Sequence, residues 1–138
     1  MTGLTRQYGE EEVERRRLAE IFEGAPVFLA ILSGPDHIFE EVNLSYRELI
    51  GHRDLIGKRL VDGLPEIAGT VWMDRLDHVY RTGEPLVQRG APVLLARAKG
   101  QPLEEKYVDY AYKPRRGEDG FISGIIVLGV DTSLVHNC

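Results

Sequence analysis

The chain has 138 residues, of which 43% are hydrophobic and 28% are charged, and its formal net charge at pH 7 is −5. This length fits one domain with a single core, and the acidic balance argues against a general nucleic-acid or anionic-membrane surface. No segment approaches the roughly 20 apolar residues of a membrane span. The N-terminus lacks the apolar segment of a signal peptide, and the only cysteine, Cys138, allows no internal disulfide, so we expect a cytoplasmic protein.

The N-terminal part of the chain contains one predicted helix. Residues 1–9 are small or polar without periodicity, and they are predicted to be disordered. Residues 10–23 are predicted to form a helix with acids in its first turn and arginines behind them. Its narrow apolar stripe indicates a cap on the domain or a dimer interface. The candidate interface residues on this helix are Val13, Leu18, Ile21 and Phe22.

Two short strands and a helix are predicted next. The apolar run at residues 26–32 and the segment IFEEV at 38–42 are predicted strands, and the turn-like SGPDH between them indicates a hairpin. Asn43 is a predicted N-cap for a helix over residues 44–50, which Gly51 is predicted to end. The residues of this helix that are expected to face inward are Leu44, Leu49 and Ile50.

The central segment, residues 51–69, holds four glycines and one proline and is predicted to form short helical turns. Residues 70–82 have the clearest helical periodicity, and Gly83 is the predicted residue after the helix end. The apolar side chains of this helix fall on one face: Val71, Trp72, Leu76, Val79 and Tyr80. His78 lies off that face, so we expect it to be exposed and to pair with Asp74.

Three strand-like segments close the domain, and residues 134–138 are a predicted tail. PLVQRGAPVLLA contains Gly90 and Pro92, which predicts a bulge or an edge position. LEEKYVDYAYKP alternates between two faces. One face holds Val108, Tyr110 and Tyr112, and the other holds Tyr107, Asp109 and Ala111. With FISGIIVLGVDT as the last strand, the element order predicts an α+β fold: one five-stranded antiparallel sheet with helices on one face and an N-terminal helix.

The last strand is apolar on both faces. A half-exposed antiparallel strand is polar at every second position, whereas residues 125–128 are Ile, Ile, Val and Leu. The outer face of the strand, with Leu128 as its candidate interface residue, needs a cover, because a continuous exposed apolar patch is unusual on a monomer. The N-terminal helix and a second copy of the sheet are the two available covers, and we expect both, in a homodimer.

Four local patterns resemble the PAS (sensory box) family over roughly residues 18–133. DHIFEEVNLSYRELIG resembles the second strand and first core helix of that family, and GHRDLIGKRLVDGLPEI resembles the segment before its long helix. HVYRTGEPL is similar to the end of that helix and the turn into the third strand. YKPRRGEDGFISGIIVLGVDTS is similar to the closing hairpin, with Asp131 and Thr132 at its end. The four patterns occur in the order and spacing of the family.

The resemblance implies a PAS-like or profilin-like sheet over residues 24–133 and a sensory role in a bacterial two-component system, of the kind found in sensor histidine kinases. The implied partner is a downstream effector domain or kinase, and the module itself is expected not to be an enzyme. In sensor kinases a coiled-coil linker leaves the last strand, and residues 132–138 are too short for one. We therefore expect a module separated from a longer sensor, or one that signals by association alone.

The resemblance also implies a pocket between the sheet and the helices that binds a small, mostly apolar ligand. The alternative is that the same residues form an ordinary hydrophobic core without a ligand. Ligand binding is expected to change the packing of the last strand and so the dimer geometry. The candidate pocket residues are Phe28, Phe39, Tyr46, Leu49, Trp72, Leu76, Val79, Tyr110 and Ile126. Among them, Trp72 and Tyr110 combine bulk with a polar group.

Cofactor motifs known from the family do not match this sequence. The flavin photosensors need a reactive cysteine on a central helix, whereas Cys138 is at the chain end. The haem sensors need a histidine on the long helix, where His78 is expected to face solvent. His37, His52 and His136 have no second ligand at metal spacing, and no glycine-rich phosphate motif is present. We expect no flavin, haem, metal or nucleotide cofactor.

Two other functions remain open from the sequence. Asp109 with a tyrosine has the chemistry of the base and enolate stabiliser in a small α+β isomerase or hydratase, provided that Asp109 points into the pocket. A solvated Asp109 beside packing tyrosines is favoured over this, because no second acid or histidine has a spacing that completes the mechanism. A ligand-free dimerisation module is the third interpretation.

Overall fold

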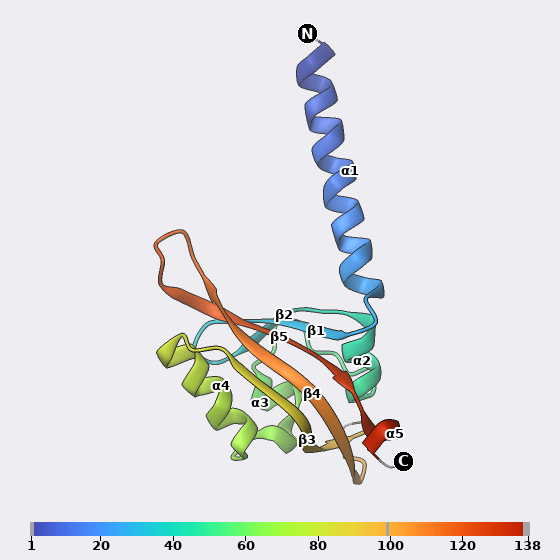
Figure 1. The fold of residues 1–138 in the computed structure, drawn as a ribbon, viewed down its shortest axis with the longest axis vertical. Coiled ribbons are helices and arrows are strands. Elements are labelled where there is room, and N and C mark those ends of the chain that lie inside the picture. Colours follow the sequence, from blue (N-terminus) through green and yellow to red (C-terminus); the bar gives the residue numbers. More distant parts are fainter. Residues whose placement is uncertain (1, 99, 137–138) are drawn as a thin grey trace.

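The predicted strands form one antiparallel sheet in the computed structural model, which describes residues 2–98 and 100–136. The spatial order is β2-β1-β5-β4-β3, so the first and last strands in the chain pair inside the sheet (Figure 1). The strands are β1 (Phe28–Ser33), β2 (Ile38–Val42), β3 (Leu86–Ala96), β4 (Leu103–Arg116) and β5 (Ile122–Asp131). The predicted α+β fold with a five-stranded antiparallel sheet is confirmed.

The helices of the central segment lie on one face of the sheet (Figure 1). They are α2 (Leu44–Ile50), α3 (Leu60–Gly63), the 3-10 turn η1 (Pro65–Ile67) and α4 (Val71–Thr82). Between them and the sheet lies one hydrophobic core. Leu44 and Val71 were expected to face this core but are 40% and 50% exposed. Each is the first residue of its helix, where the side chain lies at the end of the apolar face.

Asn43 begins α2 as predicted, and its side chain also joins three segments of the chain. Its Oδ1 accepts hydrogen bonds from the backbone N–H groups of Tyr46 (3.0 Å) and Leu29 (2.8 Å). Its Nδ2 donates to the carbonyl oxygens of Phe22 (3.0 Å) and Val27 (2.9 Å). Because Asn43 is fully buried, water cannot replace these bonds without local opening of the structure.

Replacing Asn43 with Ala is expected to lower the free energy of unfolding by about 2–4 kcal/mol, since it removes a helix cap and leaves buried backbone groups unpaired. Thr70 is a matched control, because it caps α4 by accepting one longer bond from Trp72 N at 3.3 Å. Thr70→Ala is expected to cost about 1 kcal/mol. Urea denaturation measures both variants, and equal losses would contradict the role assigned to Asn43.

Helix α1 (Thr2–Gly24) is longer than predicted, since it begins at Thr2 and residues 2–9 are helical where disorder was expected. Its glutamate- and arginine-rich sequence favours a helix, which outweighs the isolated glycines near its start. Residue 1 lies outside the described residues. The helix projects from the body of the domain (Figure 1), and its main contacts are with α2. The expectation that this helix covers the outer face of the last strand is therefore wrong.

The end of the domain is fixed to β4. Thr132 N donates to the carbonyl oxygen of Tyr107 (2.7 Å), and Ser133 Oγ accepts from Tyr107 N (3.0 Å). A short helix, α5 (Ser133–His136), follows where a tail was predicted. Cys138 lies outside the described residues. Within the residues that are described, no helix is both long and apolar enough to cross a membrane.

The face of the sheet opposite α2, α3 and α4 carries an outer apolar patch on its two central strands. Ile126 pairs with Ile31 and Leu128 pairs with Leu29 across β5 and β1. The patch consists of Leu29, Ile31, Ile126, Leu128 and Val130, all of which are partly exposed. Within the single chain, α1 does not cover this face of the last strand. The outer apolar patch is therefore a surface that a second molecule can bury.

Candidate ligand cavity

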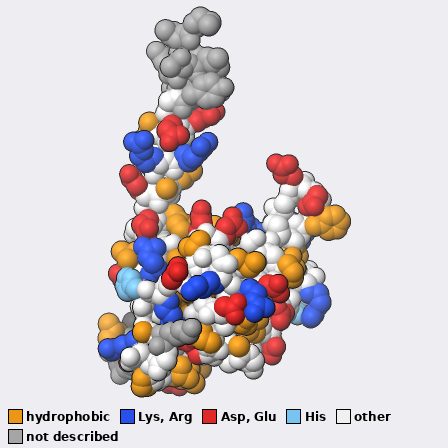
Figure 2. All heavy atoms as spheres, turned by 180° about the vertical axis from the view of Figure 1, so that it is seen from behind, with side chains coloured by type: hydrophobic (Ala, Val, Ile, Leu, Met, Phe, Trp, Pro, Cys, Tyr) orange, Lys and Arg blue, Asp and Glu red, His pale blue; other side chains and the backbone are white. Residues whose placement is uncertain are grey.

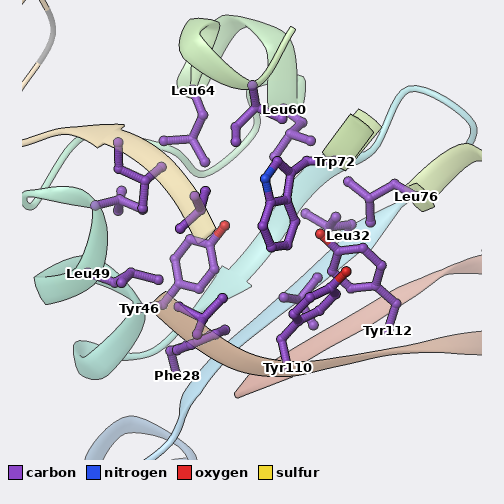
Figure 3. A pocket seen from close by; sticks show the side chains of 16 residues that line it. Phe28, Leu32, Tyr46, Leu49, Leu60, Leu64, Trp72, Leu76, Tyr110 and Tyr112 are labelled. Carbon is purple, nitrogen blue, oxygen red and sulfur yellow. The ribbon is translucent and has the colours of Figure 1, made fainter. Parts of the chain in front are cut away.

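A cavity of about 60 Å³ lies between the sheet and the helices (Figure 3). This is more than the roughly 30 Å³ that one water occupies in the liquid and less than half of the roughly 150 Å³ cavity that holds benzene in an engineered protein core. Six of the nine candidate pocket residues line it: Phe28, Tyr46, Leu49, Trp72, Leu76 and Tyr110. The cavity therefore lies where the sequence predicts a pocket.

Three candidate residues do not line the cavity. Phe39 and Val79 are 1% and 0% exposed and belong to the surrounding core. Ile126 lies on the outer face, and its neighbour Val127 lines the cavity instead. The pairing of Val127 with Ala30 and Tyr112 fixes this register, and a difference of one residue moves a strand side chain to the other face.

Aromatic rings form one side of the cavity. The Trp72 and Tyr110 ring centroids are 4.7 Å apart, and those of Tyr110 and Tyr112 are 4.9 Å apart. On the other side, Phe28 and Phe39 each contact the Tyr46 ring edge-on at 6.0 Å. Figure 3 shows Trp72 between these two groups, with the Tyr46 hydroxyl pointing toward it. Aromatic pairs of this kind contribute about 0.5–1.5 kcal/mol each beyond their buried area, so they stabilise the walls of the cavity.

The Tyr110 hydroxyl is fully engaged at the edge of the cavity. It accepts a hydrogen bond from Arg75 Nη1 (3.0 Å) and donates one to Gln88 Oε1 (2.8 Å). The Arg75 guanidinium also lies 5.1 Å from the centre of the Trp72 ring, a cation–π distance. These contacts join α4 to β3 and β4, and they hold the Arg75 guanidinium against the Tyr110 hydroxyl and the Trp72 ring.

Two other tyrosine hydroxyls and one indole nitrogen are unpaired. Among the described residues, Tyr46 Oη, Tyr112 Oη and Trp72 Nε1 have no hydrogen-bond partner. Burial raises the pKa of Tyr46, an effect that nearby Arg53 offsets in part, and it raises the pKa of Tyr112 well above its ordinary value. Both hydroxyls therefore stay protonated at physiological pH and can donate hydrogen bonds.

A buried ion pair fixes the wall formed by α2, η1 and β3. The Arg53 and Glu66 side chains are 8% and 7% exposed, and the guanidinium donates two hydrogen bonds to the carboxylate. Arg53 also donates to the carbonyl oxygens of Ile50 (2.9 Å) and Ala96 (2.7 Å), and Glu66 Oε2 accepts from Ala96 N (2.9 Å). Burial alone raises the pKa of Glu66, but the bonds from Arg53 and Ala96 outweigh it and lower the pKa to about 2.

Asp109 lies on the face of β4 opposite the cavity. Its Oδ1 accepts a hydrogen bond from Gly90 N (2.7 Å), at the predicted bulge of edge strand β3, where the pairing shifts between Gln88 and Ala91. Gly90 adopts the left-handed conformation with φ 59° that this bulge requires. The isomerase alternative needs the Asp109 carboxylate in the pocket. Because the carboxylate lies on the opposite face of β4, it cannot act as the base in this cavity.

The histidines take positions that the sequence only partly predicts. His78 is exposed as expected, but its Nε2 lies 3.8 Å from Glu84 and not beside Asp74. His37 is 1% exposed, and its Nε2 lies 2.7 Å from Asp77 Oδ1, which joins the β1–β2 turn to α4. Within the described residues, no three His, Cys, Asp or Glu side chains gather as a metal site would need.

Ten lining residues were missing from the candidate set, and strand alternation could have found three of them. Leu32 lies on the face of Phe28, and Val108 and Tyr112 lie on the face of Tyr110. Val127 was missed in favour of its neighbour Ile126, because residues 125–128 are apolar at every position. The other six come from the short helices, the end of α2 and β3: Ile50, Leu60, Leu64, Ile67, Val93 and Leu95. Segment 51–69 has no sustained period, so nothing in its sequence shows which side chains turn inward.

Several solved structures share this fold. A VqmA dimer from Vibrio cholerae matches with a TM-score of 0.65 and 22% identity, over 87% of this chain and 55% of that one. A PAS domain from Colwellia psychrerythraea matches with a TM-score of 0.66 and 12% identity, over 86% and 97%. A sensory box sensor histidine kinase from Vibrio cholerae matches with a TM-score of 0.56 and 21% identity, over 91% and 97%.

This chain spans about half the length of the VqmA chains that it matches. At these identities the similarity shows the fold alone. The strongest assignment comes from the sequence as a whole, because the PAS fold family PAS_4 matches residues 22–137, most of the chain. Together with the five-stranded sheet and its helical cover, this match shows that the chain belongs to the PAS fold family.

Proposed function

We propose that this chain is a non-catalytic sensory module that binds a small, mostly apolar ligand in the cavity and transmits occupancy through β5 to a dimer interface. One observation carries this proposal: Val127 lines the cavity, while Ile126 and Leu128 on either side of it belong to the outer apolar patch. A ligand that displaces Val127 also displaces its two neighbours, because successive side chains of a strand share one backbone.

The dimer is supported by two exposed apolar surfaces on the single chain. The first is the outer apolar patch on β1 and β5. The second is the stripe on α1, where Val13, Leu18 and Ile21 are 52%, 57% and 60% exposed and Phe22 is partly buried. A monomer rarely leaves such surfaces open, and a second copy that packs sheet against sheet buries the first of them. The related VqmA is described as a dimer.

The downstream partner is proposed to be an effector domain or kinase of a two-component sensor in the cytoplasm of a bacterium. The matches to PAS domains of sensor histidine kinases support this class. Other structures with this fold are described as a VqmA–ligand–DNA complex and as an RNA-binding receptor. The net charge of −5 favours a protein partner over nucleic acid for this chain.

A ligand-free dimerisation module remains the second candidate, because a cavity of about 60 Å³ is small for a ligand site. Native mass spectrometry of the purified chain, together with its visible absorption spectrum, separates the two. We expect a dimer carrying a small adduct and a spectrum without flavin or haem bands. A dimer without an adduct favours the second candidate, and a monomer without an adduct contradicts the proposed function.

Leu49→Phe is the matched variant for this experiment. Leu49 lines the cavity but is only partly buried, so a larger side chain enters the cavity with little strain. The variant is expected to keep the dimer mass and to lose the adduct. If the adduct persists at the parent level, the molecule is bound somewhere else.

A further inference from the structure

The cavity has an uncharged lining and offers hydrogen-bond donors. All of its lining side chains are aliphatic or aromatic, and its polar atoms are tyrosine hydroxyls and one indole N–H. Of the neighbouring charges, Arg53 and Glu66 pair with each other, and Arg75, which lies outside the cavity lining, donates to the Tyr110 hydroxyl. A charged ligand would lose its hydration without gaining a counter-ion from the lining, which is costly in a buried site.

The unpaired donors border open space. His37 Nδ1 is the only side-chain polar atom of the described residues that is fully enclosed without a partner. Tyr46 Oη, Tyr112 Oη and Trp72 Nε1 have no hydrogen-bond partner in the same part of the chain, so they remain accessible to a small molecule. The Tyr46 hydroxyl and the Trp72 indole face the same part of the cavity (Figure 3). Buried donors of this kind bind an acceptor when one is present.

We propose that the cavity binds a neutral molecule no larger than a five-membered ring that carries a hydrogen-bond acceptor, a ring nitrogen or a carbonyl oxygen. The acceptor binds the Tyr46 hydroxyl and the Trp72 Nε1–H, and the apolar remainder packs against the Trp72 and Tyr110 rings. A five-membered ring is the upper limit of size, because the cavity of about 60 Å³ is less than half of one that holds benzene. This inference rests on the proposed function, since it names the chemical class of the ligand for that cavity.

Three five-membered rings of similar size test the acceptor and the charge separately. Thiazole has an acceptor nitrogen, thiophene has none, and tetrazolate is an anion at pH 7. Each is titrated into the full chain labelled with nitrogen-15. Trp72 is the only tryptophan, so its indole N–H gives a single resonance that reports on the cavity. Thiazole is expected to shift this resonance saturably and to bind about fivefold more tightly than thiophene, and tetrazolate is expected not to bind.

Tyr46→Phe tests the assigned donor. It is expected to reduce the preference for thiazole over thiophene to less than twofold. Tyr80→Phe is the matched control, because Tyr80 lies on α4 outside the cavity lining and its change is expected to leave the preference unchanged. The proposal is overturned if tetrazolate binds as tightly as thiazole, if wild type shows no preference for the acceptor, or if no ring gives a saturable shift.

The failure of this inference is distinguishable from failure of the proposed function. A charged adduct in native mass spectrometry, with no thiazole preference, overturns the ligand class and leaves a sensory module with a different ligand. A monomer without an adduct overturns the sensory proposal, whatever the rings do. A cavity that holds only water gives no saturable shift with either neutral ring, which also counts against the ligand class.

Discussion

Replacing Glu66 with Gln is expected to lower the free energy of unfolding by about 3–5 kcal/mol, because it leaves the buried Arg53 guanidinium without its counter-ion. Both side chains are nearly inaccessible to solvent, so water cannot take the place of the lost carboxylate. The loss also weakens the contacts that hold Ile50, η1 and Ala96 around the cavity. Urea denaturation of the variant and wild type at pH 7 measures the difference.

The same pair predicts a pH dependence. The pKa of Glu66 is about 2 in the folded chain and 4.5 is its ordinary value, which approximates the unfolded state. A depressed carboxyl pKa stabilises the fold above the unfolded value, and this contribution is lost as the pH falls from about 5 to about 2. The lost contribution is about 3 kcal/mol at 1.4 kcal/mol per pKa unit. Glu66→Gln is expected to remove this part of the pH dependence.

Glu104→Gln is the control for both measurements. Glu104 pairs with Arg97 at 2.9 Å, but these side chains are 42% and 79% exposed, so the loss is expected to stay below about 1 kcal/mol. Arg53→Met combined with Glu66→Leu is expected to be more stable than either single charge removal, since no buried charge remains. If Glu66→Gln costs no more than Glu104→Gln, the pair does not fix the cavity wall.

Replacing Leu128 with Glu is expected to weaken the dimer more than a hundredfold. The side chain lies on the outer apolar patch beside Leu29, and a carboxylate buried there between two sheets has no partner. Ile126→Glu is expected to act in the same way, because Ile126 lies on the same face beside Ile31. Sedimentation velocity over a concentration series measures the dissociation constant.

Gln101→Glu is the control for these variants, since it adds the same charge in the turn between β3 and β4, away from the outer apolar patch. It is expected to keep the dissociation constant of wild type. Urea denaturation confirms that each variant is folded before its mass is compared. Folded Leu128→Glu and Ile126→Glu proteins that keep the parent dimer mass would show that the patch is not the interface.

The sequence predicts the sheet because alternation and turns are local signals. The faces of β4 follow from Val108, Tyr110 and Tyr112, and Asn43 marks the start of α2 through its own chemistry. The inward face of β5 could not be read in the same way, since Ile125 to Leu128 are apolar at every position. Only pairing with β1 and β4 chooses Val127 over Ile126.

The polar contacts around the cavity join distant parts of the chain, which explains why the sequence does not reveal them. Arg53 binds Glu66 and Ala96, which are 13 and 43 positions away. His37 binds Asp77 across 40 positions. The direction in which α1 leaves the domain could not be predicted either. Its apolar stripe indicates that the helix packs against another surface, but it does not indicate which one. These contacts depend on how distant segments pack together, and the periodicity within one segment carries no information about that packing.

The dimer dissociation constant of Val127→Leu tests the link between cavity and interface most directly. The added methylene enters the cavity and leaves every side chain of the outer apolar patch unchanged. The account predicts that the dissociation constant of the folded variant differs from wild type by at least about fivefold, the lower end of measured couplings between sites. A folded variant with the dissociation constant of wild type would contradict the proposal that β5 transmits the state of the cavity.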